Sequence, residues 1–386
     1  MARQVSIIVG ILALLNAFGA WRVMARIPWA GDHPALAWLT ALGFFALQMA
    51  GPFGDHLWFP AMRRAGLGLI VRVVDWISHL AFGAMSLMVV FAIVLDAVTI
   101  PWRLIAPPAD PLAFDRAALM TMGAAIIVTM VIGIWQARRG PVVHVTEVPL
   151  ANLPPAFDGF RIAQISDLHV GPTIGRGYVR SVVDMVNGTT PDMIALTGDF
   201  ADSNPDDVEQ EIAPLAGLKA THGAYFVTGN HEYFWDAAAW MAAFRRMGAK
   251  VLTNEHIILR RGTDAMVVAG VTDYSTRRMG PPHGSNPAGA LAGAPDTMKI
   301  LLAHQPASHV AAEKAGADLQ LSGHTHSGQY FPFNLMIGWF QRYYKGLNRH
   351  GALWIYVNQG TGYWGPPLRT GVPAEVTLLI LRRTPS

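Results

Sequence analysis

Five short clusters of metal-ligating residue types follow one another in the second half of the chain. They are Asp167-Leu168-His169, Gly198-Asp199, Gly229-Asn230-His231-Glu232, Ala303-His304 and Gly323-His324-Thr325-His326. Carboxylate, amide and imidazole ligands without sulfur suit Mn, Fe or Zn. Pairs of such cations clamp phosphate oxygens and make a water molecule nucleophilic near neutral pH. The residue types therefore predict a hydrolytic site that holds two divalent cations.

Taken singly, most of the clusters also have an ordinary structural interpretation. Asp199 after a glycine is typical of a turn, and a lone His304 is more typical of a core or a surface. His324 and His326 are more specific, because side chains two residues apart can reach two metals about 3.5–4 Å apart. Asp199 can bridge two cations through its two oxygens. The prediction therefore depends on the ordered set.

Each cluster lies where an apolar run ends, which predicts that strands position the site. The runs are Arg161 to Ser166, Met193 to Thr197, Ala224 to Thr228, Lys299 to Ala303 and Asp318 to Ser322. Further strands are expected at Ala265 to Val271, Leu353 to Val357 and Val376 to Leu381, and helices at Tyr178 to Val186, Ala237 to Met247 and Ala307 to Lys314. This alternation predicts an α/β domain with its ligands gathered at one sheet edge.

The first part of the chain has a different character. Charged residues make up only 14% of the chain, against roughly 25% in soluble domains, and the deficit is concentrated here. Apolar stretches at residues 5–21, 35–51, 67–100 and 117–135 are close to or above the roughly 20 residues that span a bilayer. We predict an all-α bundle of about four transmembrane helices over residues 1–136, a linker over 137–157 and a catalytic domain over 158–386. A cleaved signal peptide is the alternative for the first stretch.

Charged residues near the spans suggest an orientation. Five arginines lie on the amino-terminal side and four on the other: Arg3, Arg63, Arg64, Arg138 and Arg139 against Arg22, Arg26, Arg103 and Arg116. This excess favours a cytoplasmic amino terminus and a cytoplasmic catalytic domain. In the third stretch Arg72, Asp75 and His79 share one helical face, which we interpret as a satisfied polar face rather than a site.

Composition limits the partners. The chain has no cysteine, which excludes disulfides and thiolate ligands. The formal net charge of +3 is small and forms no dense basic stripe, so nucleic acid is not an expected partner. The expected partners are the lipid bilayer and a phosphorylated substrate. The oligomeric state is left open.

Together the clusters resemble the signature of the calcineurin-like metallophosphoesterase family, which runs Asp-x-His, Gly-Asp, Gly-Asn-His-Asp/Glu, His and Gly-His-x-His. The resemblance covers about residues 158–386 and implies a two-sheet β sandwich flanked by helices. It implies one metal held by Asp167, His169, Asp199 and His326, and a second held by Asp199, Asn230, His304 and His324. His231 is implied to protonate the leaving oxygen without binding metal.

Within the family, the runs Gly323 to Gln329 and Gly360 to Glu375 look like the membrane-tethered bacterial branch. Some members of that branch are hydrolases of the lipid A precursor UDP-2,3-diacylglucosamine, which implies a lipid-linked substrate and the bacterial inner membrane. Ser327 and the run Phe200-Ala201-Asp202 depart from many relatives and leave the substrate open. The alternatives are a tethered phosphatase or phosphodiesterase for soluble nucleotides or phosphoproteins, and a non-enzymatic membrane sensor or scaffold with structural metals.

The segment Phe331 to Gly346 follows the histidine pair directly and is rich in aromatic residues, with Arg342 and Lys345 beside them. Aromatic and basic side chains are typical of segments that lie in the headgroup region of a bilayer. The segment therefore fits two structures about equally: an interface element that admits a lipid-linked substrate, or a folded lid or core segment.

Overall fold

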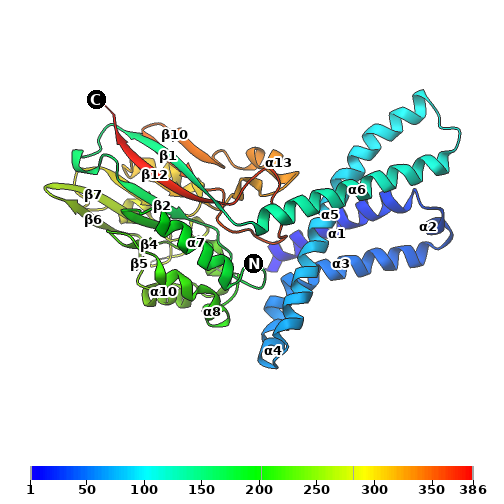
Figure 1. Ribbon diagram of the computed structural model, residues 1–386, viewed down its shortest axis with the longest axis horizontal. Helices are drawn as coiled ribbons and strands as arrows, with labels where there is room; N and C mark the ends of the chain where they lie inside the picture. The colour runs from blue at the N-terminus through cyan, green and yellow to red at the C-terminus, as the bar shows by residue number, and fades with distance from the viewer. Residues whose placement is uncertain (1, 201, 281, 385–386) are drawn as a thin grey trace. The chain divides into compact units, whose positions relative to one another are not determined.

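The computed structural model describes residues 2–200, 202–280 and 282–384, which form two compact units. The first unit contains Met1–Trp135 and Gly365–Thr370, and the second contains Gln136–Trp364 and Gly371–Ser386. The first is helical, and the second combines strands and helices (Figure 1). The short segment Gly365–Thr370, which we expected in the catalytic domain, thus groups with the helical unit.

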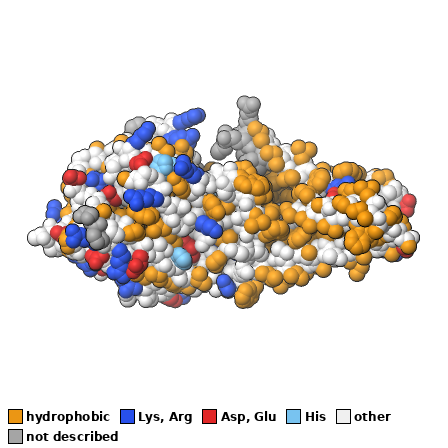
Figure 2. All heavy atoms as spheres, turned by 90° about the horizontal axis from the view of Figure 1, so that it is seen from above, with side chains coloured by type: hydrophobic (Ala, Val, Ile, Leu, Met, Phe, Trp, Pro, Cys, Tyr) orange, Lys and Arg blue, Asp and Glu red, His pale blue; other side chains and the backbone are white. Residues whose placement is uncertain are grey.

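The helical unit is built from α1 (Ala2–Met24), α2 (Pro28–Asp32), α3 (Pro34–Leu57), α4 (Phe59–Arg64), α5 (Gly68–Ile105) and α6 (Pro111–Arg138). Helix α5 packs against α1 and α3. Among the described residues, three segments are long and apolar enough to cross a membrane: Pro34–Gly54, Gly68–Ile105 and Pro111–Arg138. The apolar helix Val9–Met24 is shorter. Hydrophobic side chains cover the helical unit, whereas charged side chains gather on the other unit (Figure 2).

Polar residues inside the helical unit differ in how they are satisfied. Asp96 accepts from Arg22 Nε over 2.6 Å and also contacts Arg26. Asp75 is 1% exposed, and neither carboxylate oxygen receives a hydrogen bond from the described residues, although His79 Nδ1 lies 3.3 Å from Asp75 Oδ1. On this polar face Asp75 therefore has an ion-pair partner in His79, but its carboxylate accepts no hydrogen bond from the described residues. Helical spacing identifies a shared face but does not show which neighbours that face meets.

The second unit contains two six-stranded sheets. The first has the order β1-β12-β2-β3-β4-β5 and the second the order β10-β11-β9-β8-β7-β6. The strands of the first sheet are β1 (Val142–Leu150), β12 (Glu375–Arg383), β2 (Arg161–Ile165), β3 (Met193–Leu196), β4 (Ala224–Phe226) and β5 (Lys250–Val251). Those of the second are β10 (Gly346–His350), β11 (Leu353–Val357), β9 (Leu319–Ser322), β8 (Lys299–Leu302), β7 (Asp264–Gly270) and β6 (Glu255–Arg261). Strands β2 to β5 are parallel, as are β7, β8, β9 and β11.

Helices connect the strands and flank the sheets. They are α7 (Arg176–Gly188), α8 (Glu209–Ile212), α9 (Asn230–Trp235), α10 (Ala237–Arg246), α11 (Pro287–Ala290), α12 (His309–Lys314) and α13 (Phe333–Phe340). Short 3-10 turns lie at Pro155–Phe157, Pro205–Val208, Ala213–Gly217, Tyr274–Thr276, Pro306–Ser308 and His326–Gly328. The expected helices and strands are present with boundaries shifted by a few residues at most. The fold is the α/β sandwich that we predicted, preceded by apolar helices.

Apolar side chains explain how the two sheets come together. Ile162 on β2, Ile300 on β8 and Leu321 on β9 belong to one buried cluster to which both sheets contribute. The other face of the first sheet meets α7 and α10, where Val179, Val182, Val183, Val186, Trp240 and Phe244 are buried. The valines recur three and four residues apart, so α7 buries one apolar stripe. Strands that are covered on both faces consist of continuous apolar runs, which is why the sequence predicted them.

The predicted linker over 137–157 is wrong in its middle, because Val142–Leu150 forms β1. This strand pairs in parallel with β12 at the edge of the first sheet, and most of its residues are exposed or half-buried. An edge strand tolerates Pro149, because only one side of its backbone must pair. The segment resembled a linker in the sequence because it contains prolines and, being mostly exposed, lacks a continuous apolar run.

Candidate metal centre

All seven predicted ligands lie just after the carboxyl ends of five strands, in loops or in the first residue of the following helix or turn. Asp167 and His169 follow β2, Asp199 follows β3, Asn230 follows β4, His304 follows β8, and His324 and His326 follow β9. The first three strands belong to one sheet and the last two to the other. The packing of the two sheets therefore brings together ligands that are far apart in the sequence.

Five of these ligand residues have a left-handed backbone. Their φ angles are 53° at Asp167, 53° at His169, 55° at Asp199, 72° at His324 and 48° at His326. A non-glycine residue costs roughly 1–3 kcal/mol in such a conformation and keeps it only where the surroundings enforce it. The sharp turns direct successive side chains off the strand ends into one space. Strained backbone concentrated at one cluster is typical of a functional site.

Glycines beside the ligands allow the loops to approach closely. A Cβ atom on Gly229 would lie 2.1 Å from Asp199 Oδ1, and one on Gly323 would lie 2.1 Å from Asp167 Oδ2. Both positions therefore exclude any side chain. This explains why glycine precedes Asn230 and His324 in the two clusters.

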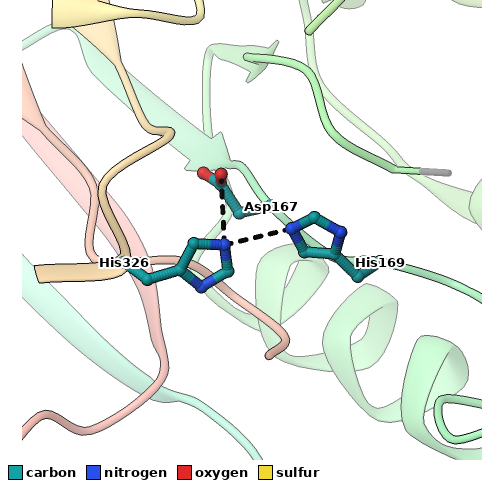
Figure 3. Close-up of side chains that lie close together, drawn as sticks. All are labelled: Asp167, His169 and His326. Carbon is teal, nitrogen blue, oxygen red and sulfur yellow. Dashed lines mark hydrogen bonds and ion pairs between the residues drawn. The ribbon is translucent and has the colours of Figure 1, made fainter. Parts of the chain in front are cut away.

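The first group of converging side chains is Asp167, His169 and His326 (Figure 3). His326 Nε2 lies 3.5 Å from Asp167 Oδ1 and 3.0 Å from His169 Nε2. The backbone N–H of His324 donates to both Asp167 oxygens, over 2.9 and 3.0 Å. Two ring nitrogens and a carboxylate oxygen thus point at one buried position, as a cation with N/O ligands requires.

The second group is Asp199, His304 and His324. His304 Nε2 lies 3.1 Å from Asp199 Oδ2 and 3.2 Å from His324 Nδ1. Asn230 Oδ1 is buried and has no hydrogen-bond partner among the residues that the structure describes. Buried polar atoms are nearly always partnered, so an orphaned amide oxygen here fits a metal ligand. The residues present therefore fit a second cation.

Asp199 lies where the two groups meet, because it also forms a group with His169 and His231. Burial acts to raise the pKa of its carboxyl, but the imidazoles of His304 and His231 outweigh burial and hold that pKa well below its usual value. The side chain is therefore an anion at neutral pH. A buried anion that belongs to two groups of potential ligands suits a bridging ligand.

His231 is oriented by its own set of partners. Its Nδ1 lies 2.8 Å from Asp202 Oδ1, and its Nε2 lies 4.0 Å from Asp199 Oδ2. Burial acts to lower the pKa of the imidazole, but Asp199 and Asp202 outweigh it and raise that pKa to about 9. With Nδ1 held by Asp202, the ring directs Nε2 toward the cluster.

Asp202 is a functional residue that the sequence reasoning missed. Its Oδ1 lies 2.8 Å from His231 Nδ1 and also 3.1 Å from His169 Nδ1, so one carboxylate orients a predicted ligand and the predicted acid. Burial opposes ionisation, but His169 and His231 lower the pKa of this carboxyl to about 2. The signal in the sequence was an acidic residue three positions after Asp199.

Glu232 ends the third cluster, and its role becomes clear only in the structure. Its carboxylate accepts from the backbone N–H groups of Gly229, Asp199 and Phe200 over 2.6, 3.0 and 2.7 Å. It thus ties the loop after β3 to the loop after β4. Positioning of this kind fixes ligands without contributing a donor atom of its own.

Known proteins are similar to this chain in sequence. The model for calcineurin-like phosphoesterases matches residues 160–328. A relative called transmembrane protein with metallophosphoesterase domain, from Bos taurus, is 35% identical over 405 residues that cover 99% of this chain and 90% of the relative. The chain therefore belongs to the calcineurin-like phosphoesterase family.

Two further relatives extend the comparison. The protein of the same description from Danio rerio is 33% identical over 397 residues, which cover 98% of this chain and 89% of the relative. An uncharacterized metallophosphoesterase of Helicobacter pylori strain J99 is 34% identical over 262 residues, 64% of this chain and 66% of the relative. Both relatives that align over nearly the whole chain are animal proteins, so the expected bacterial branch and its lipid A substrate stay predictions.

Family membership implies a metal-dependent phosphoester hydrolase, and the Asp and His groups supply ligands for divalent metals. The three apolar segments and the relatives named as transmembrane proteins support a membrane protein.

Proposed function

We propose that the chain is a membrane-bound hydrolase that uses two divalent cations, Mn, Fe or Zn, to cleave a phosphodiester or pyrophosphate bond. The observation that carries the proposal is the convergence of the ligand groups on Asp199. Asn230, which follows β4, supports it because its buried Oδ1 has no hydrogen-bond partner among the described residues. One cation would be held by Asp167, His169, Asp199 and His326. The other would be held by Asp199, Asn230, His304 and His324.

In this reaction the chain binds and orients the phosphate and handles one proton. Cations bound by the ligands supply the positive charge that neutralises the phosphate oxygens and activates water. His231 Nε2 faces the cluster and donates a proton to the leaving oxygen, while Asp202 fixes the ring through Nδ1. This arrangement favours an enzyme over a scaffold with structural metals, because a structural site does not need an oriented proton donor.

The test of catalysis is metal-dependent turnover by the full chain purified in detergent. We expect a chromogenic phosphodiester to be hydrolysed when Mn²⁺ is added, and a chelator to remove the activity until Mn²⁺ is restored. Elemental analysis should find two metals per chain in the active protein, as the two ligand groups imply. Two bound metals without turnover on any phosphoester would instead favour the sensor or scaffold.

The proposed substrate is amphiphilic and presented at the bilayer, with a UDP-diacylglucosamine-type lipid as the specific candidate. Helix α13 supports this proposal because it has no buried residue, and its Leu335, Trp339 and Phe340 are 68%, 77% and 73% exposed. Arg342 and Lys345 just beyond it are also exposed. Aromatic and aliphatic side chains on one short helix, followed closely by two basic residues, suit the headgroup region. Tyr343, by contrast, is buried in the core and is not available to lipid.

Helix α13 is also tied to the ligand loop. Thr325, between the two metal-binding histidines, donates from Oγ1 to the backbone oxygen of Tyr344 over 2.7 Å. A Cβ atom on Gly328 would lie 2.4 Å from the backbone oxygen of Phe333, so the helix begins in close contact with the turn after His326. A substrate whose acyl chains met α13 would therefore have its phosphate near the cluster.

Replacing Trp339 and Phe340 with serine should slow hydrolysis of an acylated substrate by roughly 10- to 100-fold more than that of a small soluble phosphodiester. Acyl chains remote from the phosphate supply binding energy that the small substrate never had. Initial rates on both substrates in mixed micelles measure the difference. The matched control is Ile258→Ser on β6, another exposed apolar residue, which should leave the ratio unchanged. Equal losses on both substrates would make α13 a structural lid and favour the soluble-substrate alternative.

The orientation of the catalytic domain stays a prediction from the arginine distribution. We propose a cytoplasmic domain on that basis. Placement in a bacterial inner membrane rests on the likeness to the bacterial branch alone.

A further inference from the structure

Two exposed aromatic rings flank the proton donor. The ring centroids of Phe234 and Trp364 lie 5.1 and 5.6 Å from the centroid of the His231 ring. These side chains are 57% and 56% exposed, whereas His231 is 7% exposed. Scattered apolar residues on a surface need no explanation, but two large rings against one catalytic imidazole form a local apolar wall.

The elements that position the ligands also fix both rings. Phe234 lies on α9, the helix that begins with Asn230 and His231, and residues three apart share a helix face. Trp364 is held by Gln329, three residues after His326: Gln329 Nε2 donates to the Trp364 backbone oxygen over 3.0 Å, and Trp364 N–H donates to Gln329 Oε1 over 2.9 Å. The two rings are therefore placed relative to the cluster by helix geometry and by the bonds between the Gln329 side chain and the Trp364 backbone, while both rings stay exposed.

We propose that Phe234 and Trp364 bind the leaving group. The enzyme then prefers phosphoesters whose leaving alcohol is apolar within a few atoms of the ester oxygen. This rests on the proposed role of His231 as the acid. A leaving oxygen that receives a proton from His231 Nε2 must come within hydrogen-bond distance of that atom. Whatever is bonded to that oxygen then lies beside the two rings, where an apolar group buries surface and a polar group loses hydration.

The apolar wall and the exposed face of α13 would contact different parts of the substrate. Helix α13 would meet chains remote from the phosphate, whereas Phe234 and Trp364 meet the part of the alcohol within a few atoms of the leaving oxygen. Small soluble esters therefore test the wall alone. Apolar pockets discriminate between groups of this size by roughly 10- to 200-fold.

The experiment compares 3-phenylpropyl and 3-methoxypropyl esters, whose alcohols are of similar acidity, so that their intrinsic reactivities match. Each is prepared as a phosphate monoester and as a methylphosphonate monoester, the latter standing in for a phosphodiester with one cleavable ester. The full chain in detergent with Mn²⁺ is assayed by chromatography of the released alcohol. We expect kcat/KM to favour the phenylpropyl ester by roughly 10- to 100-fold.

Variants assign the preference to the two rings. Trp364→Ala and Phe234→Ala should each lower the ratio of kcat/KM values several-fold, and Phe234→Leu should keep most of it because an apolar surface remains. Met279→Ala, an exposed apolar residue that is not placed beside His231, should leave the ratio as in the wild type. Metal content verifies that each variant is folded around its site.

The outcomes separate this inference from the proposed function. Two results would contradict leaving-group binding by the two rings while supporting the proposed hydrolase activity. One is Mn²⁺-dependent hydrolysis with equal kcat/KM for the two esters, and the other is a preference that survives both alanine variants. Absence of hydrolysis of every ester tested, with two metals bound, would overturn both.

Discussion

Replacing His231 with alanine is expected to lower kcat by about 10²- to 10⁴-fold while the metal content of the protein stays the same. His231 presents Nε2 to the cluster, but it is assigned to proton transfer rather than to ligation. Its backbone N–H donates to Asp199 Oδ1 over 2.8 Å, and alanine keeps this bond. Steady-state kinetics with a chromogenic phosphodiester, together with elemental analysis of the same sample, measures the two quantities separately.

Asp202→Asn is the informative companion to this variant. It removes the charge that orients both His231 and His169 but keeps the size of the side chain. We expect a smaller loss of kcat than in His231→Ala, together with metal binding weakened by roughly 10- to 100-fold, because Asp202 also supports a ligand. Loss of both metals in His231→Ala would contradict the assignment and make His231 a ligand.

Replacing Asp199 with asparagine should weaken binding at both metal positions by about 100-fold or more, since Asp199 is the one carboxylate placed to serve both. The amide has one oxygen in place of two and carries no charge to offset two cations. Isothermal titration of the metal-free protein with Mn²⁺ measures the two affinities. Activity should fall with metal occupancy and recover in part at high Mn²⁺ concentration.

The matched control for this change is Asp273→Asn. Asp273 is fully buried nearby but accepts hydrogen bonds from Ser275 and Gln305 instead of forming a group with the metal-binding histidines. The Asp273→Asn variant should retain two metals per chain. Wild-type affinity at both positions in Asp199→Asn would show that another residue forms the bridge.

The ligand residues could be predicted from the sequence because each follows a continuous apolar run. Runs such as Met193 to Leu196 are buried on both faces, and the carboxyl ends of parallel strands meet at one edge. Proximity between Asp167 and His326, 159 positions apart in the numbering, thus followed from strand order and from the family likeness. The membrane helices were predictable for the same reason, since their signal is length and composition alone.

Other features carry no such signal. Asp202 orients two histidines from a loop without periodicity, and its partners His169 and His231 become neighbours only when β2, β3 and β4 pair side by side in the first sheet. Strand β1 lacks a buried face along most of its length, and its register comes from β12 rather than from its own pattern. Asp75 is buried, and helical spacing could not predict this because it does not encode the packing of α3 against α5. Tertiary contacts decided each of these cases.

The position of β12 between β1 and β2 has a consequence for biogenesis. Glu147 on β1 and Arg382 on β12 contact each other although they are 235 residues apart in the sequence. At a synthesis rate of roughly 5–20 residues per second, β1 emerges some 10–50 s before the strand that it must pair with. Until then the edges of β1 and β2 stay open, and unpaired strand edges promote aggregation. The first sheet is therefore completed only after β12 has been synthesised, and a chain that stalls before β12 would expose the two edges that β12 normally joins.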